Sequence, residues 1–355
     1  MANGKNNGGA KNGNRGRSNA SKACLEPKVC RWKSNKERLR GFLSLFKKED
    51  NVLVTIWADP DSLASALAIK RLLTYRVSSV TIAHPNEIKR VNNQAMVQLL
   101  KIPLVKLRSL KVADFSKKIL VDSQPPHFPE FSAIEYDAVI DHHPLTTGWQ
   151  APFVDIRPEY GAVSSMMTEY LKAAGIKPSV ALATALFYGI KVDTRNFEKQ
   201  ATVHDVLSFQ YLFKRINRHL VHKIEASDIR RSELKYFRTA FDVMKIYKSR
   251  IFAHLGKVHN PDILVVVADF FNHVHDIGWV FVSGEYKEKL VVIIRCDGYR
   301  KNAGSLAKRA FGQLGTAGGH RESARAEIPL ENLEGLVRTL STRTLQRLVS
   351  KHFRS

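Results

Sequence analysis

The sequence predicts an α/β protein with a doubly wound, mostly parallel sheet and a second, smaller α/β domain. Short runs rich in valine and isoleucine, such as residues 52–56 and 119–121, alternate with segments of helical spacing over residues 51–213. Runs of this kind are typical of buried strands in a parallel sheet. The alternation of strands and helices favours a doubly wound sheet, and a further set of strand and helix patterns follows beyond residue 246.

The individual elements follow from apolar spacing and from turn residues. In the first domain we expect strands at residues 52–56, 77–84, 119–122 and 138–141, and helices at 35–46, 62–68, 93–100, 164–174 and 180–188. In the second domain we expect strands at 262–269, 278–282 and 289–295, a helix at 304–311, a glycine-rich turn at 315–320 and a basic amphipathic helix at 336–353.

These elements divide the chain into four segments. Residues 1–34 are expected to form a disordered basic tail, because their first part consists largely of Gly, Asn, Lys and Arg. Residues 35–213 form the first domain, residues 214–245 a helical connector, and residues 246–355 the second domain with the basic C-terminal helix.

Charge is the most unusual feature of the composition. The formal net charge is +23 and the isoelectric point is near 10.0, which points to a polyanionic partner such as nucleic acid. The basic tail and the C-terminal helix are the expected contacts. A basic tail that only aids solubility is the alternative reading.

Composition also bears on location. No apolar stretch reaches the roughly 20 residues that span a bilayer, and residues 1–21 lack the apolar core of a secretory signal. The three cysteines form neither a metal-ligand spacing nor an even disulfide framework. The sequence therefore predicts a cytoplasmic protein without a membrane partner.

Acidic clusters in a fixed order carry the chemistry of the first two hundred residues. Several of them end a predicted strand, and the carboxyl ends of parallel strands form one ligand-binding edge of a sheet. Converging carboxylates repel one another unless a cation neutralises them. The sequence therefore predicts a divalent metal site, although the aspartates of the first cluster would also suit helix N-termini. The clusters are Asp59-Pro60-Asp61, Asp122, Asp141-His142-His143 and Asp193-Thr194.

The order of these motifs resembles the DHH phosphoesterase superfamily, which is named for the triplet Asp141-His142-His143. The C-terminal half resembles the DHHA1 domain associated with that superfamily. The resemblance covers about residues 51–329. It rests on the upstream aspartate pair, the lone strand-end aspartate and the downstream Gly-Ile-x-x-Asp-Thr that ends at Thr194.

The resemblance implies a centre of two Mn²⁺ or Mg²⁺ ions that activates a water for attack on phosphorus. It makes Asp122 the expected bridging ligand. It implies that His143 contacts the phosphate or assists proton transfer, and that Asp141 orients an imidazole. The implied metal ligands are Asp59, Asp61, Asp122, His142 and Asp193.

One position departs from the family pattern. In the alignment that keeps both Asp59 and Asp61, Thr55 stands where the family has a histidine, four residues before the pair. A threonine replaces imidazole poorly as a ligand, so one metal site is expected to be weakened. If the protein is a weakened enzyme, the substitution Thr55→His is expected to raise its activity.

The second domain is expected to bind substrate. Gly318-Gly319-His320 resembles the glycine-rich signature of DHHA1 domains, and glycines there let backbone N–H groups approach a phosphate. His320 would hydrogen-bond the substrate, and Arg295 at a strand end would donate two hydrogen bonds to phosphate. An ordinary turn with a surface histidine is the alternative.

Three functions follow. The first is a metal-dependent phosphoesterase, similar to nano-RNases and bisphosphate nucleotide phosphatases, that hydrolyses short oligonucleotides, dinucleotides or nucleoside bisphosphates. The second is a catalytically weakened family member that binds nucleotide or nucleic acid without efficient turnover. The third is an inorganic pyrophosphatase or polyphosphatase, ranked last because Gly318-Gly319-His320 points to the DHHA1 class. The sequence leaves homodimerisation open.

Overall fold

The computed structural model describes residues 27, 29, 33–198, 201–227, 229–298, 301–333 and 341–351. The expected disordered tail at 1–34 therefore lies almost wholly outside the described residues, as do parts of the expected C-terminal helix. The chain divides into two compact units. The first comprises Met1–Asn86 and Pro103–Arg215, and the second comprises Glu87–Ile102 and Ile216–Ser355.

The first unit is built on a six-stranded sheet in the order β3-β2-β1-β4-β5-β6, and every neighbouring pair of strands is parallel. This confirms the predicted doubly wound parallel sheet. The strands are β1 (Asn51–Ile56), β2 (Ser79–His84), β3 (Leu104–Lys106), β4 (Lys117–Val121), β5 (Ala138–Asp141) and β6 (Phe153–Ile156).

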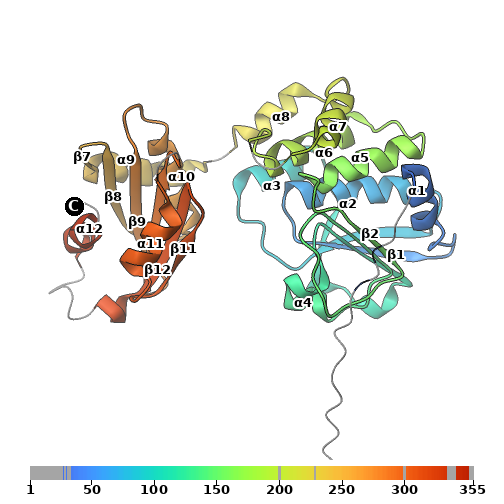
Figure 1. The fold of residues 1–355 in the computed structure, drawn as a ribbon, viewed down its shortest axis with the longest axis horizontal. Helices are drawn as coiled ribbons and strands as arrows, with labels where there is room; N and C mark the ends of the chain where they lie inside the picture. Colours follow the sequence, from blue (N-terminus) through green and yellow to red (C-terminus); the bar gives the residue numbers. More distant parts are fainter. Residues whose placement is uncertain are drawn as a thin grey trace, which may run out of the picture. The chain divides into compact units, whose positions relative to one another are not determined.

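Helices cover both faces of this sheet (Figure 1). One face carries α1 (Asn35–Leu43), α2 (Pro60–Leu73), α5 (Val163–Ala173), α6 (Val180–Asp193) and α7 (Val203–Phe213). The other face carries α4 (Pro129–Ser132) and the short 3-10 helices η1 (Leu107–Ser109), η2 (Val112–Asp114) and η3 (Pro125–His127).

Burial on both sides explains why β1 reads as a continuous apolar run. Val52, Val54 and Ile56 are fully buried, and so is Leu53, which packs toward Leu107 of η1. A strand that is covered on both faces gains from apolar residues at every position rather than at alternate ones. Thr55 is the polar exception inside β1 and is hydrogen-bonded, and the acidic side chains of this region stand beyond the strand ends.

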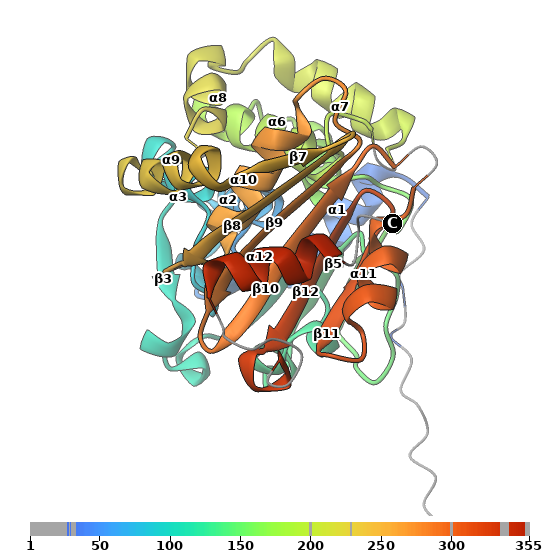
Figure 2. The same ribbon diagram turned by 90° about the vertical axis from the view of Figure 1, so that its left-hand side faces the viewer.

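The second unit has a six-stranded mixed sheet in the order β11-β12-β10-β9-β8-β7 (Figure 2). Only β8 and β9 pair in parallel, and the other neighbours are antiparallel. The strands are β7 (Lys245–Tyr247), β8 (Arg250–Lys257), β9 (Trp279–Tyr286), β10 (Lys289–Cys296), β11 (Thr316–Gly319) and β12 (Ser323–Pro329).

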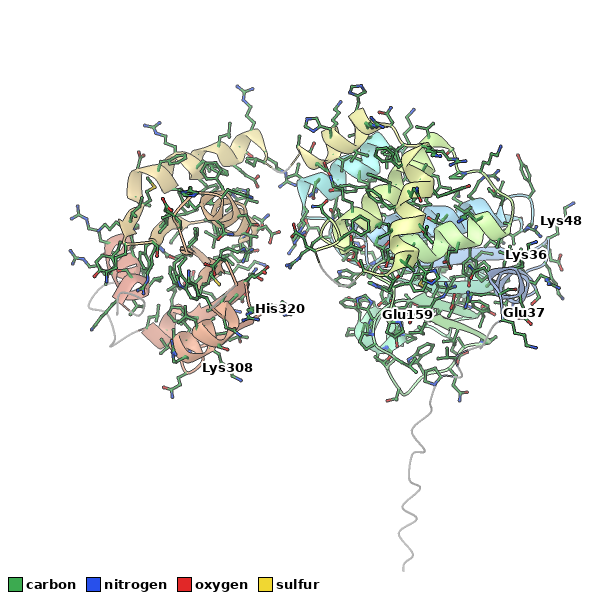
Figure 3. The ribbon with its side chains drawn as sticks, turned by 45° about the horizontal axis from the view of Figure 1, so that its top comes forward. Lys36, Glu37, Lys48, Glu159, Lys308 and His320 are labelled. Carbon is green, nitrogen blue, oxygen red and sulfur yellow. The ribbon has the colours of Figure 1, made fainter. Side chains whose placement is uncertain are left out.

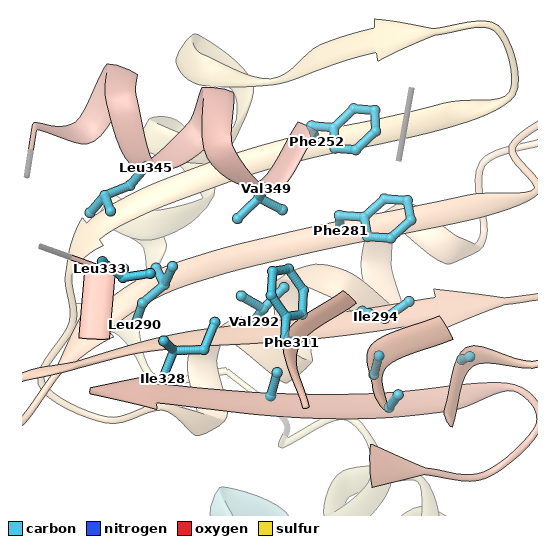
Figure 4. Packing of buried hydrophobic residues seen from close by; sticks show 14 of the residues in the cluster. Phe252, Phe281, Leu290, Val292, Ile294, Phe311, Ile328, Leu333, Leu345 and Val349 are labelled. Atoms are coloured by element: carbon cyan, nitrogen blue, oxygen red, sulfur yellow. The ribbon is translucent and has the colours of Figure 1, made fainter. Parts of the chain in front are cut away.

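Two apolar cores flank this second sheet. One packs α11 (Ala303–Phe311) and α12 (Thr342–Lys351) against side chains that include Phe252 and Phe281 (Figure 4). The other packs α9 (Leu234–Val243) and α10 (Asp262–Asn272) against the opposite face. The unit also holds α3 (Val91–Leu99), α8 (Arg218–Glu225) and the 3-10 helices η4 (Arg231–Glu233) and η5 (Leu330–Leu333).

Two expectations for the second domain are wrong. Residues 262–269, expected as a strand, belong to the helix α10. Its buried side chains Ile263, Leu264, Val267, Ala268 and Phe271 recur at helical spacing, so burial of one helix face outweighs the strand preference of the valines. The expected turn at 315–320 contains the edge strand β11, which pairs with β12.

The basic C-terminal helix is present as α12 within the described residues. Leu345 and Val349 are buried in the core, while Arg343 and Arg347 are exposed. The residues expected as a connector, 214–245, contain α8, η4 and α9. Among the described residues, no helix combines the length and apolar character needed to cross a membrane.

Candidate metal centre

Strand order determines where the acidic residues meet. The strands run outward from β1 in one direction and from β4 in the other, so the winding reverses between these two neighbours. Ligand sites of open parallel sheets form at such a point, beyond the carboxyl ends of the strands. Asp59 and Asp61 follow β1, Asp122 follows β4, and Asp141 ends β5. The first three acidic clusters thus lie along one edge of the sheet.

The aspartate pair is fixed by helix N-termini. Asp59 is the N-cap of α2, and its Oδ1 accepts a hydrogen bond from Ser62 N at 2.9 Å. Asp61 accepts from Val163 N at 2.6 Å and from Ser164 N at 2.7 Å, which are the first amides of α5. Both aspartates therefore cap helices, yet a carboxylate oxygen keeps a further lone pair for a second partner.

Gly189 of α6 lets this arrangement close. A Cβ on Gly189 would collide with Ser164 Oγ and would lie 3.2 Å from Asp61 Oδ1. The glycine of the Gly-Ile-x-x-Asp-Thr motif is thus required by close packing against Asp61, and the same helix ends at Asp193.

His142 connects the clusters. Its Nδ1 lies 3.0 Å from the carbonyl oxygen of Tyr160, which can only accept, so Nδ1 carries the proton of the neutral ring. Its Nε2 lies 3.0 Å from Asp193 Oδ2 and 3.6 Å from Asp122 Oδ1. A metal-binding imidazole is oriented in this way, with one nitrogen anchored on a backbone carbonyl and the other facing the carboxylates that would share the ion.

Asp122 combines two energetically unfavourable features. Its backbone is left-handed, with φ of +58°. Its Oδ1 is buried and has no hydrogen-bond partner among the described residues. A buried carboxylate without a partner is strongly unfavourable unless a cation or a proton neutralises it. Strained backbone of this kind is found preferentially at functional sites.

The pKa values show how strongly the carboxylates are crowded. Burial raises the pKa of Asp61 to about 7, and the Asp193 carboxylate adds to the shift. Burial, followed by the charges of Asp59 and Asp61, raises the pKa of Asp122 well above its ordinary value. Burial opposes protonation of His142, but its hydrogen bond with Asp193, together with the charges of Asp61 and Asp193, outweighs this and raises the pKa of His142 to about 9. Without a cation, the site retains protons that a metal ion would displace.

The residues fit a divalent metal ion. Among the described residues, three groups have ligand atoms within 4.8 Å of one another; one is His127, Asp141 and His143, and the other two share His142. Of the two groups with His142, one adds Asp122 and His143, and the other adds Asp61 and Asp193. Carboxylate oxygens with one imidazole nitrogen suit Mn²⁺, and a carboxylate-rich site also suits Mg²⁺.

Asp141 lies beside this cluster rather than in it. Its Oδ1 accepts from His143 Nδ1 at 2.8 Å, and its Oδ2 accepts from Gln124 Nε2 at 2.7 Å. Burial alone would raise its pKa, but the hydrogen bond from His143 and further favourable contacts lower the pKa of Asp141. It is therefore a charged acceptor that fixes the His143 ring.

Sequence reasoning missed Gln124. This fully buried side chain donates to Asp141 and to the carbonyl oxygens of His143 and Pro144, and accepts from the N–H and hydroxyl of Thr146. It thereby holds the Asp-His-His loop. No spacing pattern marks a lone glutamine, so only the strand-end position of its neighbour Asp122 pointed toward it.

The hydroxyl of Thr55 is engaged by groups other than the carboxylates. Its fully buried hydroxyl hydrogen-bonds the Tyr136 hydroxyl at 3.0 Å and the Ile119 carbonyl oxygen at 3.2 Å. Tyr136 is itself buried, so the space beside Thr55 is filled by the phenol ring. Position 55 thus contributes to the packing between β1 and β4.

The second unit places its predicted residues at one end of its sheet. Arg295 of β10 pairs with Ser323 of β12, and the His320 amide donates to the Ser323 carbonyl oxygen. Arg295 Nε donates to Asp269 of α10 at 2.6 Å, so its guanidinium is partly engaged. His320 is exposed and projects from the surface of the unit (Figure 3).

The two glycines of this segment differ. A Cβ on Gly319 would collide with the Ser323 carbonyl oxygen, so packing requires the glycine there. Gly318 has open space around the position of a Cβ. Of these two glycines, Gly318 is therefore the one without a packing requirement.

The first domain is doubly wound and has acidic and histidine clusters at its switch point, and a mixed-sheet domain follows it. Together these features define the class of protein with which the chain is compared. The sequence model of the DHH family, N-terminal domain, matches residues 51–190. Those residues therefore form a DHH-family domain, which confirms the predicted family for this part of the chain.

The similarity to a known protein extends over more of the chain than the DHH match. An uncharacterized protein of Methanocaldococcus jannaschii is 32% identical over 306 residues, or 86% of this chain. The chain spans 62% of the length of that relative.

Solved structures agree in fold. An exopolyphosphatase-related protein from Bacteroides fragilis has a TM-score of 0.64 at 15% identity, with 89% of this chain and 95% of that one covered. RecJ from Thermus thermophilus in complex with Mn²⁺ has a TM-score of 0.50 at 14% identity, with 92% of this chain and 56% of RecJ covered. At such identity the likeness bears on the fold alone, and it confirms the predicted two-domain α/β class.

Proposed function

We propose that this protein is a metal-dependent phosphoesterase. The observation that carries the proposal is the buried Oδ1 of Asp122, which has no hydrogen-bond partner among the described residues and lies 3.6 Å from His142 Nε2. A carboxylate crowded in this way by neighbouring carboxylates is stable only with a cation or a proton. The DHH-family match of residues 51–190 supports a metal ion.

The proposed ligands would hold two ions, Mn²⁺ or Mg²⁺, with one site weakened by the loss of a ligand at Thr55. When bound, the ions lower the pKa of a water and stabilise the charge that develops on the phosphoryl oxygens. The complex of RecJ with Mn²⁺, which shares the fold, supports Mn²⁺. The ligands are Asp59, Asp61, Asp122, His142 and Asp193.

His143 and Asp141 would act on the substrate side. Because Asp141 accepts from His143 Nδ1, the free nitrogen of His143 is Nε2. The hydrogen bond with Asp141 raises the pKa of His143, which favours the protonated imidazole and so suits a proton donor. His143 would contact a phosphate oxygen or transfer a proton at Nε2, with Asp141 holding the ring.

We propose short oligonucleotides, dinucleotides or nucleoside bisphosphates as substrates. The net charge of +23 supports a polyanionic ligand. Arg295, Gly318, Gly319 and His320 of the second unit are proposed to contact it. The open space around Gly318 and the exposure of His320 support that assignment.

The test is hydrolysis of a labelled RNA dinucleotide, adenosine 3′,5′-bisphosphate and inorganic pyrophosphate, each with Mn²⁺ and with EDTA. Mn²⁺-dependent turnover that is lost in Asp122→Ala but kept in Asp114→Ala, an exposed carboxylate of the same unit, is the expected result. Turnover of pyrophosphate alone would instead favour the pyrophosphatase class.

A nucleotide-binding protein without efficient turnover is the second candidate. Thr55 favours it, because its hydroxyl is committed to Tyr136 and Ile119 and supplies no ligand. Nucleotide binding that needs Mn²⁺, without product release over many hours, would support this candidate against the enzyme.

A further inference from the structure

The imidazole ring of His143 has two other imidazoles as neighbours. His142 and His143 follow β5, and their ring centroids are 4.7 Å apart. The third ring is His127, the last residue of η3, with its centroid 5.4 Å from that of His143 and the two planes nearly perpendicular. A nitrogen of His127 lies within 4.8 Å of ligand atoms of Asp141 and His143. His127 was not among the residues expected from the sequence.

All three rings are anchored through Nδ1, but their partners differ in kind. His142 Nδ1 faces the Tyr160 carbonyl oxygen and His143 Nδ1 faces the Asp141 carboxylate, both of which accept. His127 Nδ1 faces the backbone N–H of Gln124 at 3.2 Å, which can only donate. The Ser123 hydroxyl, also at 3.2 Å from this Nδ1, can donate as well.

The partner at Nδ1 decides what Nε2 can do, because a neutral imidazole carries one proton. In His142 and His143 the proton sits on Nδ1, so Nε2 offers a lone pair to a metal ion or a proton. In His127 the lone pair sits on Nδ1, so Nε2 carries the hydrogen. His127 therefore presents a hydrogen-bond donor, and it cannot ligate a metal through Nε2 while its bond to Gln124 persists.

That donor is available. The ring is half-buried, and Nε2 has no hydrogen-bond partner among the residues that the structure describes. The neighbouring carboxylate of Asp141 repels an anionic substrate, so a neutral or cationic donor at this edge offsets part of that repulsion. An oxygen of a phosphate group is the acceptor that matches an N–H donor beside such a cluster.

We propose that His127 is a substrate-binding residue that donates a hydrogen bond from Nε2 to a non-bridging phosphate oxygen of the phosphoester. This rests on the proposed function for the identity of the substrate. His127 thus adds a third imidazole to those of His142 and His143. It would bind the phosphate rather than the metal ion.

Two substitutions separate the donor role of Nε2 from the role of Nδ1, which accepts a hydrogen bond from the Gln124 N–H. His127→Asn keeps an oxygen near the position of Nδ1 that can accept from Gln124 N–H, but removes the donor at Nε2. His127→Gln brings an amide N–H near the position of Nε2, but lacks the acceptor at Nδ1. The kcat/KM for Mn²⁺-dependent hydrolysis of the RNA dinucleotide and the Kd for Mn²⁺ by calorimetry are measured for both variants in the full chain.

We expect His127→Asn to lower kcat/KM about 10–100-fold, the effect of one hydrogen bond to a charged group, with the Kd for Mn²⁺ within about twofold of the wild type. His127→Gln is expected to retain more activity than His127→Asn. Wild-type kcat/KM in His127→Asn would overturn the proposal, and so would a large loss of Mn²⁺ affinity in that variant, which would make His127 a ligand.

A second measurement keeps the proposal separate from the proposed hydrolysis. If the wild type does not turn over any substrate, binding of adenosine 3′,5′-bisphosphate in the presence of Mn²⁺ is measured instead. Binding at least about tenfold weaker in His127→Asn supports the donor role. Equal binding by both proteins, or no binding by the wild type, overturns it.

Discussion

The first sheet ends in carboxylates, whereas the second sheet carries apolar side chains on both faces along its length. At the edge of the first, Asp61 and Asp122 are buried with raised pKa values. In the second, Val292 and Ile294 pack toward α11 and α12, and Ile293 packs toward α10. The first unit thus retains unfavourable charge at one edge of its sheet, whereas the two cores of the second unit are apolar and the buried polar pair of His254 and Ser283 lies in its sheet.

This contrast shows that the two units are stabilised by different interactions. A parallel sheet brings strand ends from distant parts of the chain to one edge, which suits a convergent ligand set. A mixed sheet with helices on both faces gains stability from apolar burial along every strand. Stability of the first unit should therefore depend on metal and protons, and stability of the second on packing.

The largest expected effect comes from removing the Asp122 carboxylate, whose Oδ1 has no hydrogen-bond partner among the described residues. Asp122→Asn keeps the side-chain shape, and asparagine tolerates the left-handed backbone at this position. We expect turnover to fall on the order of 1000-fold, because charge stabilisation by bound metal is worth several kcal/mol. The metal-free variant should melt no lower than the wild type, since a buried carboxylate is gone.

Thermal melting with Mn²⁺ and with EDTA checks both parts. Asp114→Asn is the matched control on an exposed carboxylate. A metal-free Asp122→Asn protein that melts well below the wild type would show that Asp122 stabilises the fold, against the comparison.

Truncation of a core ring should act on the second unit alone. Phe311 of α11 is fully buried, and Phe311→Ala should cost about 3–5 kcal/mol by leaving a cavity. Hydrogen exchange should show loss of protection in β9, β10 and β12, with the Kd for Mn²⁺ unchanged. Phe270→Ala, at a half-exposed ring of α10, serves as the control and should cost much less. Loss of Mn²⁺ binding in Phe311→Ala would contradict independent units.

A buried histidine gives the second unit a pH dependence of its own. Burial lowers the pKa of His254 to about 4, while an unfolded histidine titrates near 6.5. The unfolded chain therefore takes up the proton first as pH falls, so stability is full above about pH 6.5 and declines toward pH 4. The loss should approach about 3 kcal/mol.

Urea unfolding between pH 7 and pH 4, followed by hydrogen exchange of β8 and β9, measures that decline. His254→Asn should be less stable at pH 7 but should lack this part of the decline, whereas His275→Asn, at an exposed ring, should keep it. A decline of equal size in His254→Asn would assign the effect to other groups.

The smallest effect concerns Thr55. Thr55→Val removes the hydroxyl bonded to Tyr136 and Ile119, and should cost about 1 kcal/mol without changing the Kd for Mn²⁺. Thr55→His would set an imidazole against the buried Tyr136 ring, so we now expect it to destabilise the protein rather than raise its activity. Higher activity in Thr55→His would show that the phenol gives way.

Much of the first unit could be predicted because its signals are local. Strands buried on both faces are continuous apolar runs, and the acidic residues stand directly after them. The short edge strands β3 and β6 were not predicted, since few residues form each of them. Residues 262–269 were assigned to a strand because β-branched residues dominate them, although their burial follows a helical period.

For the site, the sequence indicated which residues carry charge but not what fixes them. The hydrogen bonds of Asp61 to the first amides of α5 span about a hundred residues, and no spacing pattern encodes them. Gln124 and His127 were missed for the same reason, because their roles depend on which backbone group faces them. The sequence marks Thr55 as a position without the family's histidine, but the hydrogen bond of Thr55 with Tyr136 depends on the fold and has no sequence signal.

The capping of α5 by Asp61 bears on the order of events during folding. The contact joins residues 102 and 103 positions apart, so it closes late in comparison with local helices. Until it forms, the carboxylate of Asp61 has no fixed direction and cannot take the position of the proposed metal ligand. Metal uptake should then follow the docking of α5 rather than initiate it. The ion would bind only to chains in which the contact between Asp61 and α5 has already formed.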